Sequence, residues 1–315
     1  MEKPGKAAWI KRAIAAGGEF HAMKQVPWRH NLLNISCALG LWGSIGLLLG
    51  WATVANPVLY IPLGGLLLGC LFFGHFILVV HECSHNMFLV SRNREHQKKL
   101  NRAVGIVAGG MFFTDYLVHW EKGHTVHHVR PCEDDDPQDK NPLTGKDLYR
   151  QYLGLALIPF YFMKINPSNQ YGFSLKRFLG GVVFWGPLLV LTGLFIGWWV
   201  PVALIVGQHV LMALNLTKKA EEHGCGLQYE DHFEMRSRTY LYPLAFLISP
   251  FNINYHWEHH ANFMVPWYLL PAYHERLRDL VPQEIWPYVF HQDFLQQLSG
   301  KKPLIPERLR HLVNA

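Results

Sequence analysis

The sequence contains few charged residues for its length. Asp, Glu, Lys and Arg make up 17% of its 315 residues, against about a quarter in soluble globular domains. No charged or Gly/Ser-rich linker and no repeat of fixed period interrupts the chain, so we expect one integrated domain over residues 1–315. Half of the residues are hydrophobic and they gather in long runs, a composition typical of an integral membrane protein.

The sequence also lacks the cysteine patterns of a disulfide framework or a zinc finger. Its five cysteines are scattered and odd in number and include no CxxC pair, which indicates reduced thiols in or near a cytoplasmic compartment. The basic N-terminal stretch has no long apolar segment before a small-residue cleavage site, so we expect no signal peptide. The net charge of +6 comes with no nucleic-acid-binding motif. We attribute it to basic residues that meet anionic lipid head groups.

Long uncharged runs predict four membrane-spanning helices. Residues 35–55 and 58–80 carry no charge, and each run reaches the length of about 20 residues that crosses a bilayer. Residues 179–216 form an uncharged run of nearly twice that length, with Gly197 near its middle, so we expect a second helical hairpin there. Residues 103–118 and 153–163 are apolar but too short to span. We expect these two segments to lie in the membrane interface or to pack on the rest of the protein.

The distribution of basic residues predicts the orientation of these spans. The hairpin turns near Pro57 and Trp198 contain no Lys or Arg. The basic residues occur in the N-terminal segment, in the loop between the hairpins and from Lys218 onward. The positive-inside tendency places these three segments in the cytoplasm. We therefore expect both termini to be cytoplasmic, with residues 1–29 and 281–315 as tails.

Three histidine boxes are the most informative motifs in the chain. They are HECSH at residues 81–85, HTVHH at 124–128 and HWEHH at 256–260. Residues three and four apart share one face of a helix, so each box presents its histidines together. One box alone could equally well be packed or surface histidines. Three boxes supply eight imidazoles, more than the four ligands of a zinc site, and all lie on the predicted cytoplasmic side. They indicate two adjacent transition-metal ions at the membrane surface.

The order of the motifs resembles the membrane fatty acid desaturase superfamily. Besides the boxes, residues 133–137 read EDDDP, residues 220–224 read AEEHG, and NYHWEHH is followed by VPWYLLP. The resemblance covers about residues 30–280. It implies an all-α integral membrane fold, with four transmembrane helices in two hairpins and a cytosolic helical cap that holds a di-iron site. It also implies nine ligands for two Fe²⁺ ions: His81, His85, His124, His127, His128, His223, His256, His259 and His260.

The sequence departs from the pattern of this superfamily at two places. Many relatives read HHLFPSVPW, whereas residues 259–267 read HHANFMVPW, which leaves the shape of this loop and the choice of substrate open. Some desaturases also use an asparagine one helical turn before the isolated histidine. The corresponding residue here is Lys219, whose amine would have to lose a proton to bind a metal. A water molecule could take that ligand position.

Further polar residues near the boxes are candidates for supporting roles. A carboxylate commonly accepts the second N–H of a metal-bound imidazole, although a solvated surface charge is an equally plausible role. His75 and His209 lie inside predicted spans, where we expect them to line a tunnel or to join two helices by a hydrogen bond. The candidates for contact with the metal ligands are Glu82, Glu121, Glu222, Glu258 and His119.

The resemblance implies O₂-dependent oxidation of a lipid acyl chain. Removal of hydrogen from two neighbouring carbons would give an alkene, whereas addition of oxygen would give an alcohol. The same histidines serve both outcomes, so a hydroxylase or ketolase that acts on a lipid or a carotenoid remains an alternative. The chain contains no fused cytochrome b5 signature. We therefore expect a separate electron donor of the ferredoxin or cytochrome b5 type.

Two other classes of protein share part of this pattern. HECSH also matches the HExxH pattern of a zinc intramembrane protease, with Glu82 as the general base. A single zinc site would leave both HxxHH boxes unexplained. A histidine-rich metal transporter would place its ligands in the middle of the spans, along the path of the ion. These boxes lie instead at and beyond the predicted ends of the spans.

Overall fold

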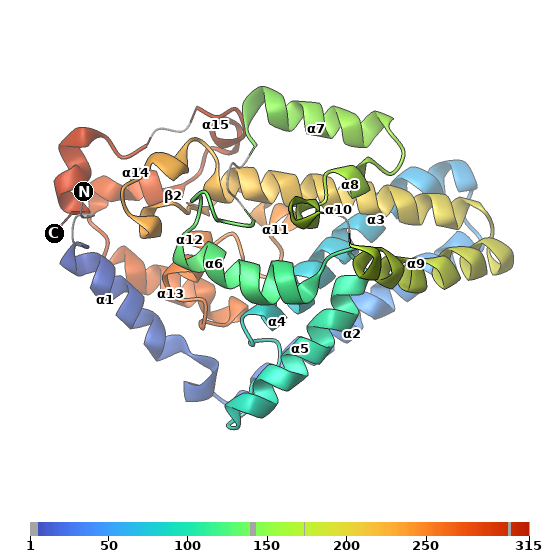
Figure 1. Cartoon of the computed structure of the whole chain (residues 1–315), viewed down its shortest axis with the longest axis horizontal. Helices are drawn as coiled ribbons and strands as arrows, with labels where there is room; N and C mark the ends of the chain where they lie inside the picture. Colours follow the sequence, from blue (N-terminus) through green and yellow to red (C-terminus); the bar gives the residue numbers. More distant parts are fainter. Residues whose placement is uncertain (1–5, 139–142, 173, 302–303, 315) are drawn as a thin grey trace. The chain divides into compact units, whose positions relative to one another are not determined.

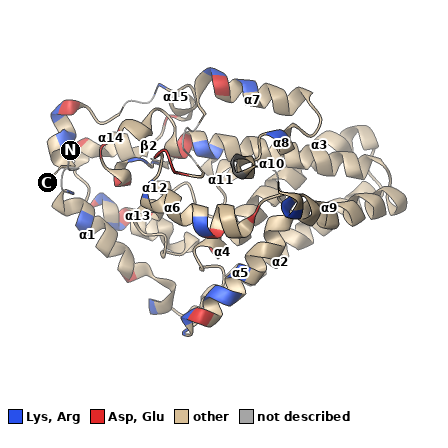
Figure 2. Ribbon diagram, viewed as in Figure 1, with Lys and Arg blue, Asp and Glu red and all other residues tan. Residues whose placement is uncertain are grey.

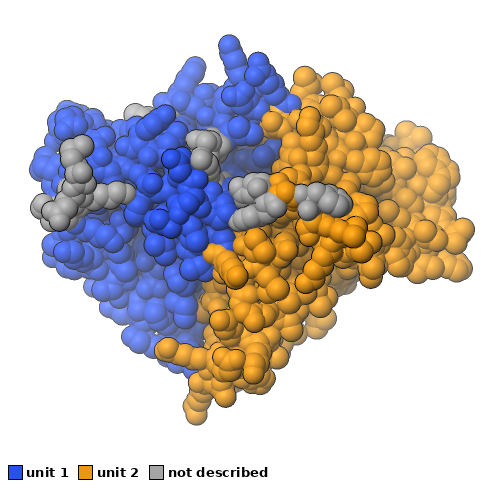
Figure 3. Space-filling model, viewed as in Figure 1, with its two compact units in different colours: residues 1–27, 123–150, 216–315 blue, residues 28–122, 151–215 orange. Residues whose placement is uncertain are grey.

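The structure is a computed structural model and describes residues 6–138, 143–172, 174–301 and 304–314. It divides into two compact units (Figure 3). Nearly all of the regular structure is helical (Figure 1), which confirms the predicted all-α class. The single domain stays a prediction. Unit 1 is Met1–Pro27, Gly123–Arg150 and Leu216–Ala315, and unit 2 is Trp28–Lys122 and Gln151–Asn215.

Among the described residues, four helices are long and apolar enough to cross a membrane, as predicted. The second of them is not a regular α-helix throughout, because its last turns continue as a π-helix. Charged residues are nearly absent from the first three (Figure 2). The spans are built from α2 (Pro27–Ala52), α3 (Pro57–His75) with the π-helix η3 (Phe76–His81) and α4 (Glu82–Ser84), α9 (Leu175–Phe195), and α10 (Trp199–His223).

Two glycines let α3 approach α10 closely within unit 2. A Cβ atom at Gly65 would lie 2.6 Å from Val206 Cγ1, and one at Gly69 would lie 2.5 Å from Val210 Cβ. Real Cβ atoms do not come this near to another heavy atom, so no larger residue fits without a shift. Small residues four apart on one helix face are a common device for packing helices in membranes. The spacing of α3 and α10 therefore depends on both glycines.

Helix α2 begins earlier than the uncharged run that predicted it. Its first turns, from Pro27, contain asparagines whose side chains form hydrogen bonds with the backbone of residues 88–90, just after the first histidine box. Asn31 Nδ2 donates to Val90 O at 2.9 Å, and Val90 N donates back to Asn31 Oδ1 at 2.8 Å. Asn34 Nδ2 donates to Phe88 O at 2.8 Å. These contacts satisfy backbone groups that would otherwise be buried without partners, and they hold the segment that follows HECSH.

The two short apolar segments also become helical. Residues 103–110 form the second half of α5, where Ile106 and Val107 are exposed and Ala108 is buried. Residues 153–163 include the end of α7 and the start of α8. The remaining elements in this part of the chain are α5 (Arg94–Gly110), the π-helix η4 (Tyr116–Lys122), α7 (Gly145–Leu157), α8 (Tyr161–Lys164) and the 3₁₀-helix η5 (Pro167–Tyr171).

Unit 1 is assembled from short helices joined by well-bonded loops. Its two strands pair in parallel, with Thr239 opposite Phe290. The α-helices and strands are α1 (Ala8–Ala16), α6 (Gly123–Val129), β1 (Thr239–Tyr240), α11 (Ala245–Ile248), α12 (His256–Ala261), α13 (Leu270–Arg278), α14 (Trp286–Val289), β2 (Phe290–His291) and α15 (Phe294–Leu298). The 3₁₀-helices are η1 (Gly17–Phe20), η2 (Ala22–Lys24), η6 (Leu227–Tyr229), η7 (Phe233–Met235), η8 (Trp267–Leu269), η9 (Gln283–Ile285) and η10 (Glu307–Leu312).

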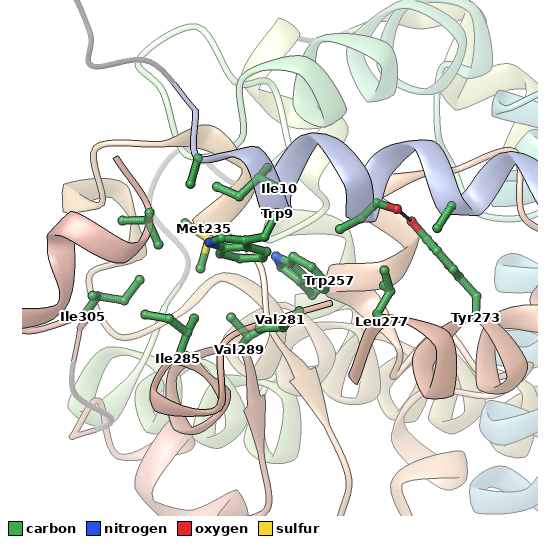
Figure 4. Packing of buried hydrophobic residues seen from close by; sticks show 14 of the residues in the cluster. Trp9, Ile10, Met235, Trp257, Tyr273, Leu277, Val281, Ile285, Val289 and Ile305 are labelled. Carbon is green, nitrogen blue, oxygen red and sulfur yellow. Dashed lines mark hydrogen bonds between the residues drawn. The ribbon is translucent and has the colours of Figure 1, made fainter. Parts of the chain in front are cut away.

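The core of unit 1 contains residues from both of the segments expected as tails. Trp9 of α1 packs on Trp257 of α12, with ring centroids 6.2 Å apart (Figure 4). Tyr273 Oη donates to Ala13 O at 2.7 Å, and Ile305 is buried in the same cluster. Trp257 lies inside the third histidine box, so the core fixes the helix that carries this box.

Candidate metal centre

Unit 1 carries seven of the nine predicted ligands on three helical segments. Helix α6 presents the second box and α12 presents the third, while the isolated histidine is the last residue of α10. In each box, spacing of three or four residues puts the imidazoles on one side of the helix. The seven residues are His124, His127, His128, His223, His256, His259 and His260.

Four histidines from these three helices converge on one point. The donor atoms of His127, His223, His256 and His260 all lie within 4.8 Å of one another. His223 Nε2 and His256 Nε2 are 2.8 Å apart. The ring centroids of His127 and His260 are 4.8 Å apart. This arrangement has the ligand number and the ligand type of a transition-metal site.

The other three histidines of unit 1 form a second group. The nitrogen atoms that His124, His128 and His259 offer as ligands also lie within 4.8 Å of one another. His124 Nε2 and His128 Nε2 are 3.2 Å apart, and the rings of His128 and His259 are 4.7 Å apart. Unit 1 therefore contains an incomplete ligand set beside a complete one.

The remaining two predicted ligands, His81 and His85, belong to unit 2 and lie next to each other there. Both side chains are buried, and their ring centroids are 4.9 Å apart. His81 is the last residue of the π-helix η3, and a second π-helix, η4, directly precedes the second box. Short π-helical insertions re-aim the side chains that follow them and are frequent at functional sites. The periodicity of the sequence did not predict either insertion.

The Nδ1 atoms of three candidate ligands in unit 1 have hydrogen-bond acceptors. An imidazole that donates from Nδ1 keeps its Nε2 lone pair for a metal. Two of the acceptors belong to the loop after α6, and the third is a backbone carbonyl. The pairs are His127 with Asp136 Oδ2 at 2.9 Å, His124 with Gln138 Oε1 at 2.5 Å, and His223 with Arg236 O at 2.7 Å.

Asp136 is itself held in place by the backbone of its loop. It accepts hydrogen bonds from Cys132 N and Gln138 N, both at 2.8 Å. Burial raises the pKa of Asp136, but the charge and hydrogen bond of His127 and these two N–H groups outweigh it and hold the pKa well below its usual range. The residue is therefore a carboxylate at neutral pH, which suits an acceptor for an imidazole N–H.

His256 and His260 are held in the neutral form. Burial, followed by the charges of neighbouring histidines, lowers the pKa of both imidazoles well below the ordinary value. A neutral imidazole is the form that binds a metal. His260 Nε2 is buried and has no hydrogen-bond partner among the residues that the structure describes. Such an atom is costly to bury unless it binds another group, so these residues fit a bound metal ion.

Two of the predicted carboxylates lie against histidines of the boxes. Glu82 Oε1 is 3.2 Å from His81 Nδ1 in unit 2, and Glu222 Oε1 is 3.2 Å from His256 Nδ1 in unit 1. Lys218 Nζ donates to the other oxygen of Glu222 at 2.6 Å. Glu222 is thus fixed between a cation and an imidazole.

Glu258, Glu121 and His119 make other contacts. Glu258 accepts a hydrogen bond from Thr239 of β1 and is paired with His274 Nδ1 of α13. It joins the helix of the third box to its neighbours. Glu121 forms an ion pair with Arg102, with Nη2 and Oε1 2.5 Å apart. His119 is buried on η4, and its ring lies 5.5 Å from that of Trp120.

Lys219 and the unusual loop after the third box have defined partners. Lys219 Nζ donates to Gln138 O at 2.6 Å, so its ammonium group stabilises the loop that carries Asp136. Asn262 lies in the HHANFM segment, where its Nδ2 donates to Ile14 O at 3.2 Å and its Oδ1 accepts from Met264 N at 3.2 Å. The changed loop is therefore tied to the N-terminal segment.

Asp136, Gln138 and His274 were not predicted from the sequence as part of the site. A signal for Asp136 was present, because the acidic stretch EDDDP follows the second box closely. Which of its carboxylates faces a histidine depends on the turn that Cys132 begins, with its positive φ of 61°. His209 Nδ1 lies 2.6 Å from Leu155 O, so this histidine joins two helices, one of the two roles expected for it.

Comparison with known proteins gives one family match and two related sequences. The fatty acid desaturase family model matches residues 56–292. The sphingolipid delta(4)-desaturase DES1 of Drosophila melanogaster is 24% identical over 250 residues, which cover 76% of this chain and 74% of that protein. An sn-1 acyl-lipid omega-3 desaturase (ferredoxin) of Nostoc sp. (strain 36) is 27% identical over 135 residues, 40% of this chain and 35% of that protein.

Proposed function

Because the chain belongs to the fatty acid desaturase family, we propose that this membrane oxidoreductase is an O₂-dependent lipid desaturase with two iron ions. The family and its relatives establish lipid desaturation as the class of reaction. The observation that carries the metal proposal is the convergence of His127, His223, His256 and His260 within 4.8 Å.

We assign one Fe²⁺ ion to these four histidines and a second to the three remaining histidines of unit 1. The family resemblance adds the two histidines of the first box, His81 and His85, to the ligands of the iron pair without assigning them to one ion. When bound, the iron pair would supply the activation of O₂ that removal of hydrogen from an unactivated C–H bond requires. Within unit 1, the ligands of the second ion would be His124, His128 and His259.

The protein's own contribution to this chemistry is to fix the imidazoles before an ion binds. Asp136 and Arg236 O accept the Nδ1 protons of His127 and His223, so both rings turn an Nε2 lone pair toward the cluster. His223 Nε2 and His256 Nε2 are 2.8 Å apart. This contact is a hydrogen bond whose donor depends on the tautomer, and a metal ion that replaces the shared proton would leave both rings free to offer a lone pair.

Glu82 acts in this proposal as an acceptor for His81 rather than as a general base. Its Oε1 is 3.2 Å from His81 Nδ1, and the residue is 6% exposed. A metallopeptidase needs this carboxylate to face a metal-bound water. The protease alternative also uses one metal, whereas unit 1 alone contains two groups of histidines.

We expect the lipid to enter from the bilayer and the electrons to come from another protein. Holding the chain in a water-free site positions the reacting carbons and prevents side reactions. One related protein carries the word ferredoxin in its name, which favours a ferredoxin-type donor here over the cytochrome b5 type. We also expect the histidine boxes and both termini to be cytoplasmic, because the distribution of basic residues follows the positive-inside tendency.

Metal analysis and mass spectrometry together test this function. The purified protein should contain two irons per chain, and membranes that express it should contain a lipid two hydrogen atoms lighter than its precursor. Formation of this lipid should require O₂ and a reductant. His260→Ala should abolish the product and reduce the iron content, while the exposed His311→Ala should change neither. A product one oxygen atom heavier, with no unsaturated lipid, would establish the hydroxylase or ketolase alternative instead.

A further inference from the structure

His75 is a buried polar residue in the middle of an apolar helix of unit 2. His75 is 5% exposed. Its Nδ1 atom has no hydrogen-bond partner among the residues that the structure describes. The nearest rings are those of Trp42, with centroids 5.3 Å apart, and Phe112, at 6.0 Å. A buried imidazole nitrogen without a partner costs free energy, so a partner from outside the chain would stabilise it.

The imidazole of His75 lines a cavity of about 470 Å³ within unit 2. The other walls are apolar and come from α2, η3, α5 and α9, and they include Val79, Val104, Met111 and Phe184. Val107, on the same cavity, is 74% exposed. The cavity has the size and the apolar lining of a site for a small lipid or drug-sized molecule.

Water is a poor occupant for this cavity. A buried water molecule needs two to four polar partners. Among the described residues, the lining offers two polar side-chain groups, the imidazole of His75 and the indole N–H of Trp42, which is too few for the several water molecules that would fill this volume. A lipid chain would instead cover the apolar walls. A hydroxyl group on that chain would bond to the imidazole of His75 in either tautomer, because a hydroxyl can both donate and accept.

We propose that this cavity is a binding site for a long-chain lipid alcohol, whose hydroxyl group bonds to the imidazole of His75. The site goes beyond the proposed function, because it is defined by binding and not by turnover. Failure of the binding test would leave the desaturase proposal untouched, and an inactive enzyme could still bind the alcohol. His75 would select lipids that carry a hydroxyl group over plain hydrocarbon chains.

Photolabelling of the full-length protein in detergent micelles tests the site. The probes are octadecan-1-ol and octadecane that carry a diazirine at the same carbon, and labelled positions are located by peptide mass spectrometry. In the wild type, the alcohol should label residues 103–111 about five times more than the alkane, as expected for one neutral hydrogen bond. The exposed His96→Leu serves as the matched control and should not change this ratio.

Three cavity variants separate a hydroxyl-binding role from a structural one. His75→Leu should reduce labelling by the alcohol to the level of the alkane and leave labelling by the alkane unchanged. Val104→Phe fills the cavity and should reduce labelling by both probes. His75→Gln keeps a hydrogen-bonding side chain and should retain part of the preference for the alcohol over the alkane. If the leucine variant does not fold, the glutamine variant still tests the hydrogen bond. Equal labelling by the two probes in the wild type, or equal loss of both in His75→Leu, would refute the site.

Discussion

The Nε2 atoms of His223 and His256 lie 2.8 Å apart, although 33 residues separate them in the sequence. His223 ends the long helix α10, and His256 begins the short helix α12. Groups on the far side of each ring hold the two imidazoles in place. Arg236 O accepts a hydrogen bond from His223 Nδ1, and Glu222 Oε1 lies against His256 Nδ1. The loop between the two helices thus helps to define the metal site without supplying a ligand.

Asp136→Asn should weaken iron binding. The change removes the negative charge opposite His127 Nδ1, with little change in size. Losses of this kind of contact cost about 10- to 100-fold in metal affinity. Competition for Fe²⁺ against a chelator of known affinity measures the effect. Asp135→Asn is the matched control, because Asp135 is half-exposed and pairs with Arg130; equal loss of affinity in both variants would contradict the role given to Asp136.

Glu82→Gln should leave measurable lipid oxidation. A glutamine side chain can still accept a hydrogen bond from His81 Nδ1 through its amide oxygen. A general base, by contrast, would be eliminated by this change. Product formation and iron content should be measured in the same preparation. Full inactivation with both irons retained would assign Glu82 a direct part in the reaction.

The metal-free protein should lose stability as the pH falls below about 6.5, the ordinary histidine pKa. Burial lowers the pKa of His256 and His260 in the folded state, so the unfolded chain takes up protons that the folded chain does not. Stability is therefore lost as the pH falls through the unfolded value. Between pH 7.5 and pH 5.5 the loss should be about 1.4 kcal/mol for each of the two groups.

Thermal unfolding of the chelator-treated protein, followed at several pH values, measures this dependence. His260→Phe should make the pH dependence shallower, because it removes one of the two groups. Replacement of the exposed His96 by glutamine should leave the dependence as it is in the wild type. A transition temperature that stays constant from pH 7.5 to pH 5.5 would show that these imidazoles are not kept neutral by the fold.

Gly69→Ala should destabilise unit 2. The new methyl group would lie 2.5 Å from Val210 Cβ and 2.8 Å from the carbonyl oxygen of Gly207. Overpacking of this kind costs about 1–3 kcal/mol. Loss of monodisperse protein on heating in detergent reports the change. Gly46→Ala on α2 meets no heavy atom within 4 Å and should be neutral or slightly stabilising, since alanine favours a helix.

The sequence predicted the spans and the histidine boxes because both follow from local periodicity. Uncharged length identifies a span, and spacing of three or four residues identifies a ligand face on a helix. It did not predict the acceptor of His127, since that depends on the turn that brings Asp136 back to α6. It also did not separate His75 from His209. Both line apolar cavities, but His209 Nδ1 bonds to Leu155 O whereas His75 Nδ1 has no partner among the described residues, a difference that only tertiary packing decides.

The packing partners of the N-terminal helix were not predictable from its sequence. Helix α1 is short and basic, and nothing in its sequence names Trp257 as the partner of Trp9. Contacts between residues so far apart depend on the whole chain being folded. For the same reason, Asn262 in the unusual loop could be described as a departure from the family but not as a residue that bonds to Ile14 O.

The three separate segments of unit 1 impose an order on biosynthesis. Trp9 is made before its partners Trp257 and Leu312, and Leu312 follows it by 303 residues. The ribosome adds about 5–20 residues each second, so α1 waits many seconds before its core exists. Once α6 has been made, its histidines likewise have no partners from the third box until α12 has been made. Iron loading is therefore expected only after α12 has been made and has joined α6.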